Sequence, residues 1–116
     1  MAGHSGDRLA AALLRTVVAL RRLRVRYVLI GAWALGVWGR PRATFDVDFL
    51  VLVEGPALDA LAAQLGEAGL TIDTEWRTCN PMLAGSQVRL TTDSIAVDLL
   101  APRDAHDRRV VERRRR

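Results

Sequence analysis

Residues 27–53 read YVLIGAWALGVWGRPRATFDVDFLVLV, and the other predicted elements are arranged around them. Two mostly apolar runs, 26–30 at the start of this stretch and 44–53 at its end, are of the kind that form buried β-strands, and the first begins one residue before the stretch. Between them, Gly31 interrupts the first run, residues 32–38 have the composition of a short helix, and Gly39 is suited to end that helix. The stretch therefore predicts a strand, a glycine turn, a helix and a second strand.

The rest of the chain supplies elements that would extend or cover a sheet. Apolar periodicity predicts helices over 7–24 and 56–68, a half-exposed strand over 70–77, a loop over 78–86, a hairpin of strands 87–91 and 94–100 turned at Thr92-Asp93, and a final helix over 103–116. In the first helix, Leu14 and Val18 share the expected apolar side. This order predicts an α+β (α/β-like) domain, a mixed β-sheet flanked by helices.

Composition excludes several classes of protein. With 116 residues, half of them apolar, the chain is one folded domain rather than a disordered segment. No apolar run reaches the ~20 residues of a membrane span, and the N-terminus lacks the apolar region of a signal peptide, so we expect a cytoplasmic protein with no membrane partner. The single Cys79 excludes an internal disulfide and a multi-cysteine zinc site.

The positive charge of the chain lies at its end. Residues 1–100 hold ten Arg and ten acidic residues, whereas residues 101–116 hold seven Arg and three acidic residues, which accounts for the net charge of +4. We therefore divide the chain into a core at 1–103 and a basic C-terminal helix or tail at 104–116. The tail has the charge to hold a phosphate backbone, although a solvated helix end is the favoured explanation.

Carboxylates interrupt two of the apolar strands. Asp46 and Asp48 lie on one face of the strand over 44–53, about 6–7 Å apart by strand geometry. Asp98 lies between Val97 and Leu99 in the last strand. Like charges in a core strand are costly unless a positive group satisfies them, and oxygen ligands select Mg²⁺ or Mn²⁺. A salt bridge to Arg40 or Arg42 is the competing explanation.

The same residues resemble the nucleotidyltransferase superfamily that includes DNA polymerase β. The motif of that superfamily is an apolar residue followed by Gly and then Gly or Ser, then Asp-x-Asp, with a third acid on a later strand. Its counterparts here are Ile30-Gly31-Ala32, Asp46-Val47-Asp48 thirteen residues later, and Val97-Asp98-Leu99. The finer pattern, which adds Ala34, Leu35, Gly39, Arg42 and Thr44, resembles the small bacterial branch that includes abortive-infection toxins of toxin–antitoxin pairs. Ala32 departs from the Gly or Ser of the motif.

The resemblance implies a metal-dependent transfer of a nucleoside monophosphate from an NTP to an acceptor hydroxyl, on RNA, tRNA or a protein. It implies Asp46, Asp48 and Asp98 as catalytic ligands of Mg²⁺ or Mn²⁺. It further implies Gly31, Ala32, Arg42 and Thr44 as nucleotide-binding residues, with Gly31 and Ala32 at a helix N-terminus. An antitoxin or toxin partner, or a homodimer, is compatible with the small size. The alternative is a catalytically inactive nucleotide- or partner-binding module of the same fold.

Overall fold

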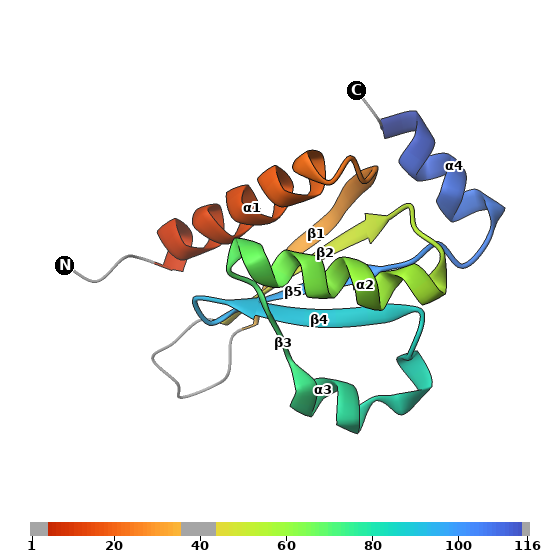
Figure 1. The fold of residues 1–116 in the computed structure, drawn as a ribbon. Helices are drawn as coiled ribbons and strands as arrows, with labels where there is room; N and C mark the ends of the chain where they lie inside the picture. Colours follow the sequence, from red (N-terminus) through yellow and green to blue (C-terminus); the bar gives the residue numbers. More distant parts are fainter. Residues whose placement is uncertain (1–4, 36–43, 115–116) are drawn as a thin grey trace.

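The computed structural model describes residues 5–35 and 44–114, which form an α+β domain (Figure 1). Its elements are α1 (Ser5–Arg22), β1 (Tyr27–Leu35), β2 (Thr44–Val51), α2 (Gly55–Leu65), the 3₁₀ turn η1 (Gly66–Ala68), β3 (Thr71–Ile72), α3 (Thr74–Cys79), the 3₁₀ turn η2 (Pro81–Leu83), β4 (Gln87–Thr92), β5 (Ile95–Leu100) and α4 (Ala105–Arg114). The expected fold class, a mixed sheet flanked by helices, is confirmed.

The sheet has five strands in the order β1-β2-β5-β4-β3. β1 and β2 pair antiparallel, as do β4 with β5 and β3 with β4, whereas β2 and β5 run parallel. The two strands that carry the aspartates are therefore direct neighbours in the middle of the sheet. This adjacency joins segments that are far apart in the sequence.

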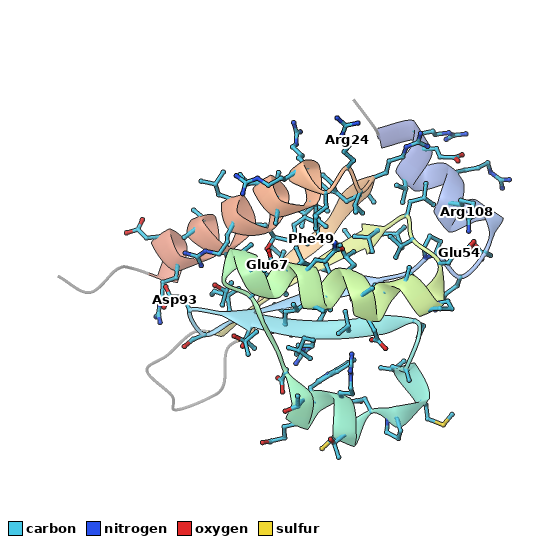
Figure 2. All side chains as sticks on the ribbon, viewed as in Figure 1. Arg24, Phe49, Glu54, Glu67, Asp93 and Arg108 are labelled. Carbon is cyan, nitrogen blue, oxygen red and sulfur yellow. The ribbon has the colours of Figure 1, made fainter. Side chains whose placement is uncertain are left out.

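The two faces of the sheet differ in what covers them. Alternate residues of the central strands, such as Val47 and Phe49 of β2 and Val97 of β5, are fully buried against α1 and α2. Both helices lie over this face (Figure 1), and Phe49 lies beneath them (Figure 2). Because side chains alternate along a strand, the aspartates next to these residues point toward the opposite face.

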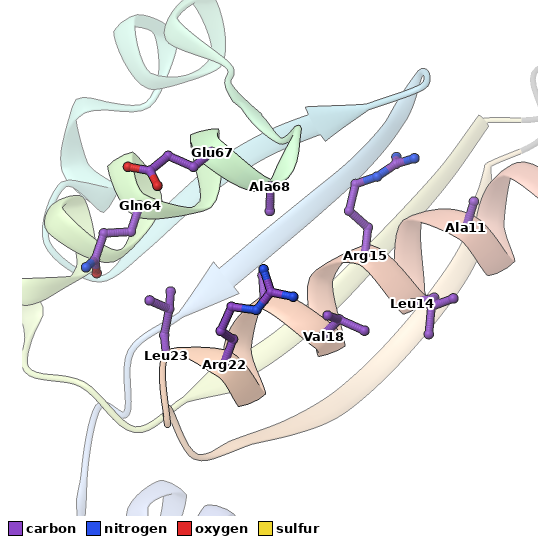
Figure 3. Close-up of a pocket in the computed structure, with 10 residues that line it drawn as sticks. Ala11, Leu14, Arg15, Val18, Arg22, Leu23, Gln64, Glu67 and Ala68 are labelled. Carbon is purple, nitrogen blue, oxygen red and sulfur yellow. The ribbon is translucent and has the colours of Figure 1, made fainter.

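One side of α1 is more exposed than expected. Its core positions are Ala12, Thr16, Ala19 and Leu20, whereas Leu14 is 65% exposed. Leu14 and Val18 instead line a groove of about 510 Å³ between α1 and α2, together with Arg15, Arg22 and Glu67 (Figure 3). The prediction that Leu14 and Val18 share the buried side was wrong because the arc of α1 that contacts the sheet is narrower than its apolar arc.

The prediction of a helix directly after Gly31 was also wrong. β1 continues through Gly31 to Leu35, and its second half pairs with the first half of β2. The ladder shifts register between Leu29 and Gly31, so the glycine marks a bulge rather than the end of the strand. Long-range pairing with β2 has overridden the local helical preference of Ala and Leu. Residues 36–38 of the expected helix, and Gly39, lie outside the described residues.

The expected strand over 70–77 was wrong in its second half. Only Thr71–Ile72 pair with β4, and α3 begins two residues later at Thr74. The cause is a helix cap, because the Asp73 carboxylate accepts a hydrogen bond from the backbone N–H of Trp76 at 2.9 Å. The expected loop over 78–86 correspondingly contains the end of α3 and η2.

The other predicted elements are confirmed with small shifts in their bounds. Gly69, with φ +95°, closes the helical segment formed by α2 and η1, as expected. The β4–β5 hairpin turns at Asp93-Ser94, one residue later than expected, and both turn residues have positive φ. α4 contacts β1 and β2, and Val111 is its fully buried residue among those described. Among the helices of the described ranges, none has the length and apolar character needed to cross a membrane.

Candidate metal and nucleotide site

The sheet brings the three predicted carboxylates together. Asp48 of β2 and Asp98 of β5 are direct partners in the parallel ladder, and Asp46 lies two residues before Asp48. Neighbouring strands are about 4.8 Å apart, so the side chains of Asp48 and Asp98 rise side by side from one face. Asp98 is 4% exposed and Asp46 is 18% exposed. The aspartates therefore form a largely buried cluster on the face opposite α1 and α2.

An arginine that the sequence reasoning missed lies in this cluster. Arg89 of β4 is the ladder partner of Asp98, and its guanidinium donates from Nε to Oδ1 at 2.8 Å and from Nη2 to Oδ2 at 2.9 Å. Nη2 also lies 3.5 Å from Oδ2 of Asp46. The Trp76 ring of α3 lies 5.4 Å from the guanidinium carbon. Arg89 thus bridges two carboxylates while stacking on an aromatic ring.

Hairpin register is the signal that would have revealed this arginine. With the turn at Asp93-Ser94, Arg89 faces Asp98 across the hairpin. A turn one residue earlier places Gln87 opposite Asp98 and leaves Arg89 without an acidic partner. The single-residue error in the expected turn therefore concealed the positive partner of Asp98.

The charges of the cluster act on one another. Burial raises the pKa of the Asp46 carboxyl above its ordinary value, Arg89 opposes that rise, and the Asp98 charge adds to it. The hydrogen bonds to Asp98 raise the pKa of Arg89, which keeps the guanidinium positive. Asp46 is therefore held in a state that is costly to ionise, as carboxylates at functional sites often are.

The side chains of the cluster have the chemistry of metal ligands, but their arrangement among the described residues does not form a three-ligand metal site. Carboxylate oxygens on one buried face are the ligands that Mg²⁺ or Mn²⁺ prefers. Within residues 5–35 and 44–114, however, no three His, Cys, Asp or Glu side chains are arranged to hold a metal ion. Arg89 donates to both oxygens of Asp98, which leaves fewer lone pairs of that carboxylate for a metal ion. The carboxylate oxygens of Asp46 and Asp48 are suitable ligands for a divalent cation, whereas Asp98 is paired with Arg89.

The predicted nucleotide-binding residues lie in different surroundings. Gly31 is the ladder partner of Asp48, so its backbone lies beside the carboxylates, and Ala32 follows it in β1. No helix begins at this point, so the expected helix N-terminus for phosphate is corrected to an edge strand of the sheet. Thr44 begins β2 opposite Leu35. Arg40 and Arg42 lie outside the described residues.

Comparison of the sequence with protein-family models gives no match, and comparison with curated proteins gives none either. The geometry of the cluster and the motif resemblance are therefore the two grounds for a functional assignment.

Proposed function

We propose that this chain is a metal-dependent nucleotidyltransferase that moves a nucleoside monophosphate from an NTP to an acceptor hydroxyl on RNA, tRNA or a protein. One observation carries the proposal: Asp48 and Asp98 are direct partners on parallel strands, with Asp46 on the same buried face and Gly31 beside them. A core strand retains such carboxylates against their burial cost only when they have a charged partner or a chemical task. Arg89 is a charged partner for Asp98 and Asp46.

In this proposal Asp46 and Asp48 hold Mg²⁺ or Mn²⁺. The bound ion would supply positive charge to the triphosphate and to the pyrophosphate that leaves. The acceptor oxygen forms a bond to the α-phosphorus while the bond to the bridging oxygen breaks, and the hydroxyl proton passes to solvent. Arg89 adds a fixed positive charge beside the same carboxylates. Because Gly31 has no side chain, the phosphates could approach the backbone of the sheet at that residue.

Thermal unfolding with Mg²⁺ and each NTP in turn tests the binding half of this proposal. We expect one NTP to raise the Tm by about 10 °C at a hundredfold excess over its Kd. The rise should disappear in Asp46→Asn and Asp48→Asn and persist in Asp59→Asn, which changes an exposed carboxylate of α2. No rise with any NTP would refute the nucleotide site.

Transfer of label from α-³²P-NTPs tests the chemical half. We expect label to appear on an acceptor in total RNA or in lysate protein, with Mg²⁺ present and EDTA abolishing it. The acceptor class is then read from sensitivity to ribonuclease or to protease.

A second function has an observation of its own in its favour. Because Arg89 engages both oxygens of Asp98, a site that binds nucleotide without transferring it also suits the geometry. Such a module would show the thermal shift with an NTP and no labelled acceptor. The two experiments together separate an enzyme from a binding module.

A further inference from the structure

We propose that Arg89 takes the position of a second divalent cation, so that the site binds one Mg²⁺ or Mn²⁺ and uses the guanidinium as its other positive charge. This inference rests on the proposed function, which assigns a divalent cation to Asp46 and Asp48. It changes the role of Asp98 from a metal ligand to the anchor of Arg89.

The contact between Arg89 and Asp98 satisfies both partners. Nε and Nη2 donate to the two different oxygens of Asp98 at 2.8 and 2.9 Å, which is the parallel fork of a bidentate pair. The Asp98 side chain is almost completely buried, and the Arg89 side chain is three-quarters buried. A metal ion that took the lone pairs used by Arg89 would have to displace these two hydrogen bonds, which would leave a guanidinium unpaired in a partly buried position.

Further contacts fix the guanidinium from outside the pair. Arg89 is in register with Asp98 in the β4–β5 ladder, so the backbone of both strands sets their separation. The Trp76 ring lies against the guanidinium, and the Asp73 cap holds the first turn of the helix that carries Trp76. Displacement of Arg89 would therefore disturb β4 and α3 as well as the ion pair.

The position of Arg89 is that of a bridging cation. Its Nη2 atom lies 2.9 Å from Oδ2 of Asp98 and 3.5 Å from Oδ2 of Asp46, so one nitrogen spans carboxylates from two strands. When all are ionised, Asp46, Asp48, Asp98 and Arg89 together carry a charge of −2. The guanidinium therefore supplies a positive charge at the position that bridges Asp98 and Asp46.

Counting bound Mn²⁺ on the full chain tests the inference without measuring activity. The free Mn²⁺ signal in electron paramagnetic resonance gives the number of ions bound per chain. We expect one ion for the wild-type chain and for Arg89→Lys, which keeps the charge. We expect two for Arg89→Met, which removes the charge and keeps an unbranched side chain, and a return to one when Asp98→Asn is added to Arg89→Met.

Arg77→Met is the matched control, because it removes another arginine of the same α3–β4 region whose partner, Asp59, is exposed. It should bind one ion. Two ions on the wild-type chain would overturn the inference and leave the proposed function standing, and this outcome does not depend on whether Arg89→Met folds. One ion on a folded Arg89→Met chain would also overturn it. No Mn²⁺ on any variant would overturn the proposed function together with the inference.

Discussion

Asp46 and Asp98 belong to one cluster, but their surroundings differ. Asp98 has a charged donor on each oxygen, whereas Asp46 meets the same guanidinium at 3.5 Å and has its pKa raised by burial. Asp98, which is more buried than Asp46, therefore also has the closer positive partner. This contrast identifies Asp46 as the carboxylate whose presence is harder to explain by stability alone.

Replacement of Asp46 by Asn should change the pH dependence of stability. A folded-state pKa above the unfolded value means that the contribution of Asp46 is present at pH values below the ordinary Asp pKa of about 3.9 and is lost as pH rises through the folded-state pKa. Asn cannot ionise, so Asp46→Asn should gain stability relative to the wild type as the pH rises above about 3.9. Urea unfolding in EDTA at each pH measures the difference.

Asp59→Asn is the control for the loss of one surface carboxylate, since its partner Arg77 lies at the surface as well. If the stability gained by Asp46→Asn over the wild type stayed constant or fell with rising pH, the assignment of a raised pKa to Asp46 would be contradicted.

Two glycines of the α2–η1 segment differ in the space that a side chain would find at each position. A Cβ on Gly55 would lie 2.6 Å from the carbonyl oxygen of Gly85, whereas a Cβ on Gly66 would meet nothing within 4 Å. Gly66 also has helical φ and ψ angles of −57° and −32°. We expect Gly55→Ala to lower the free energy of unfolding by about 1–3 kcal/mol and Gly66→Ala to raise it by about 0.4–1 kcal/mol.

Each of these variants is the control for the other in urea unfolding, because both add one methyl group to the same segment. Equal effects of the two would show that the contact between the start of α2 and Gly85 does not restrict the chain.

Elements whose signals are local could be predicted from the sequence. Apolar periodicity identified α1 and α2, and the positive φ of Gly69 matches its expected role. The second half of β1 could not be found this way, because its residues become a strand only by pairing with β2. The α3 helix was missed for a different reason: Asp73 carried a local cap signal that the alternating pattern concealed.

The candidate site, too, could be predicted from the sequence only in part. The three aspartates stand out as charges in apolar strands, and the sequence was sufficient to place them together. Arg89 required the exact pairing of a hairpin, and a shift of one residue was enough to hide it. The helix expected after Gly31 failed because strand pairing, which is set by distant residues, decides the conformation there.

The α4 helix packs against β1 and β2 and so joins the C-terminal part of the chain to the sheet. Val111 is fully buried, and the ion pair between Arg108 and Glu54, at 3.5 Å, lies at the surface (Figure 2). Exposed pairs contribute little, so the docking of α4 depends mainly on apolar contact. We expect Val111→Ala to lower the free energy of unfolding by about 1–3 kcal/mol, measured by urea unfolding.

Arg109→Ala changes an exposed residue of the same helix and should stay within about 0.5 kcal/mol of the wild type. A similar loss for both variants would mean that α4 is stabilised by its charges and not by the burial of Val111.

The parallel pairing of β2 with β5 also bears on how the molecule folds. β1–β2 and β4–β5 are local hairpins, whereas Asp48 and Asp98, which the parallel pair brings together, are separated by 50 positions in the chain. Local contacts form early and long loops close late, so we expect the two hairpins to form before they dock. Arg89 and Asp98 belong to the same hairpin. One of the three carboxylates is therefore already neutralised when the two halves meet, which lowers the repulsion that would otherwise slow this last step.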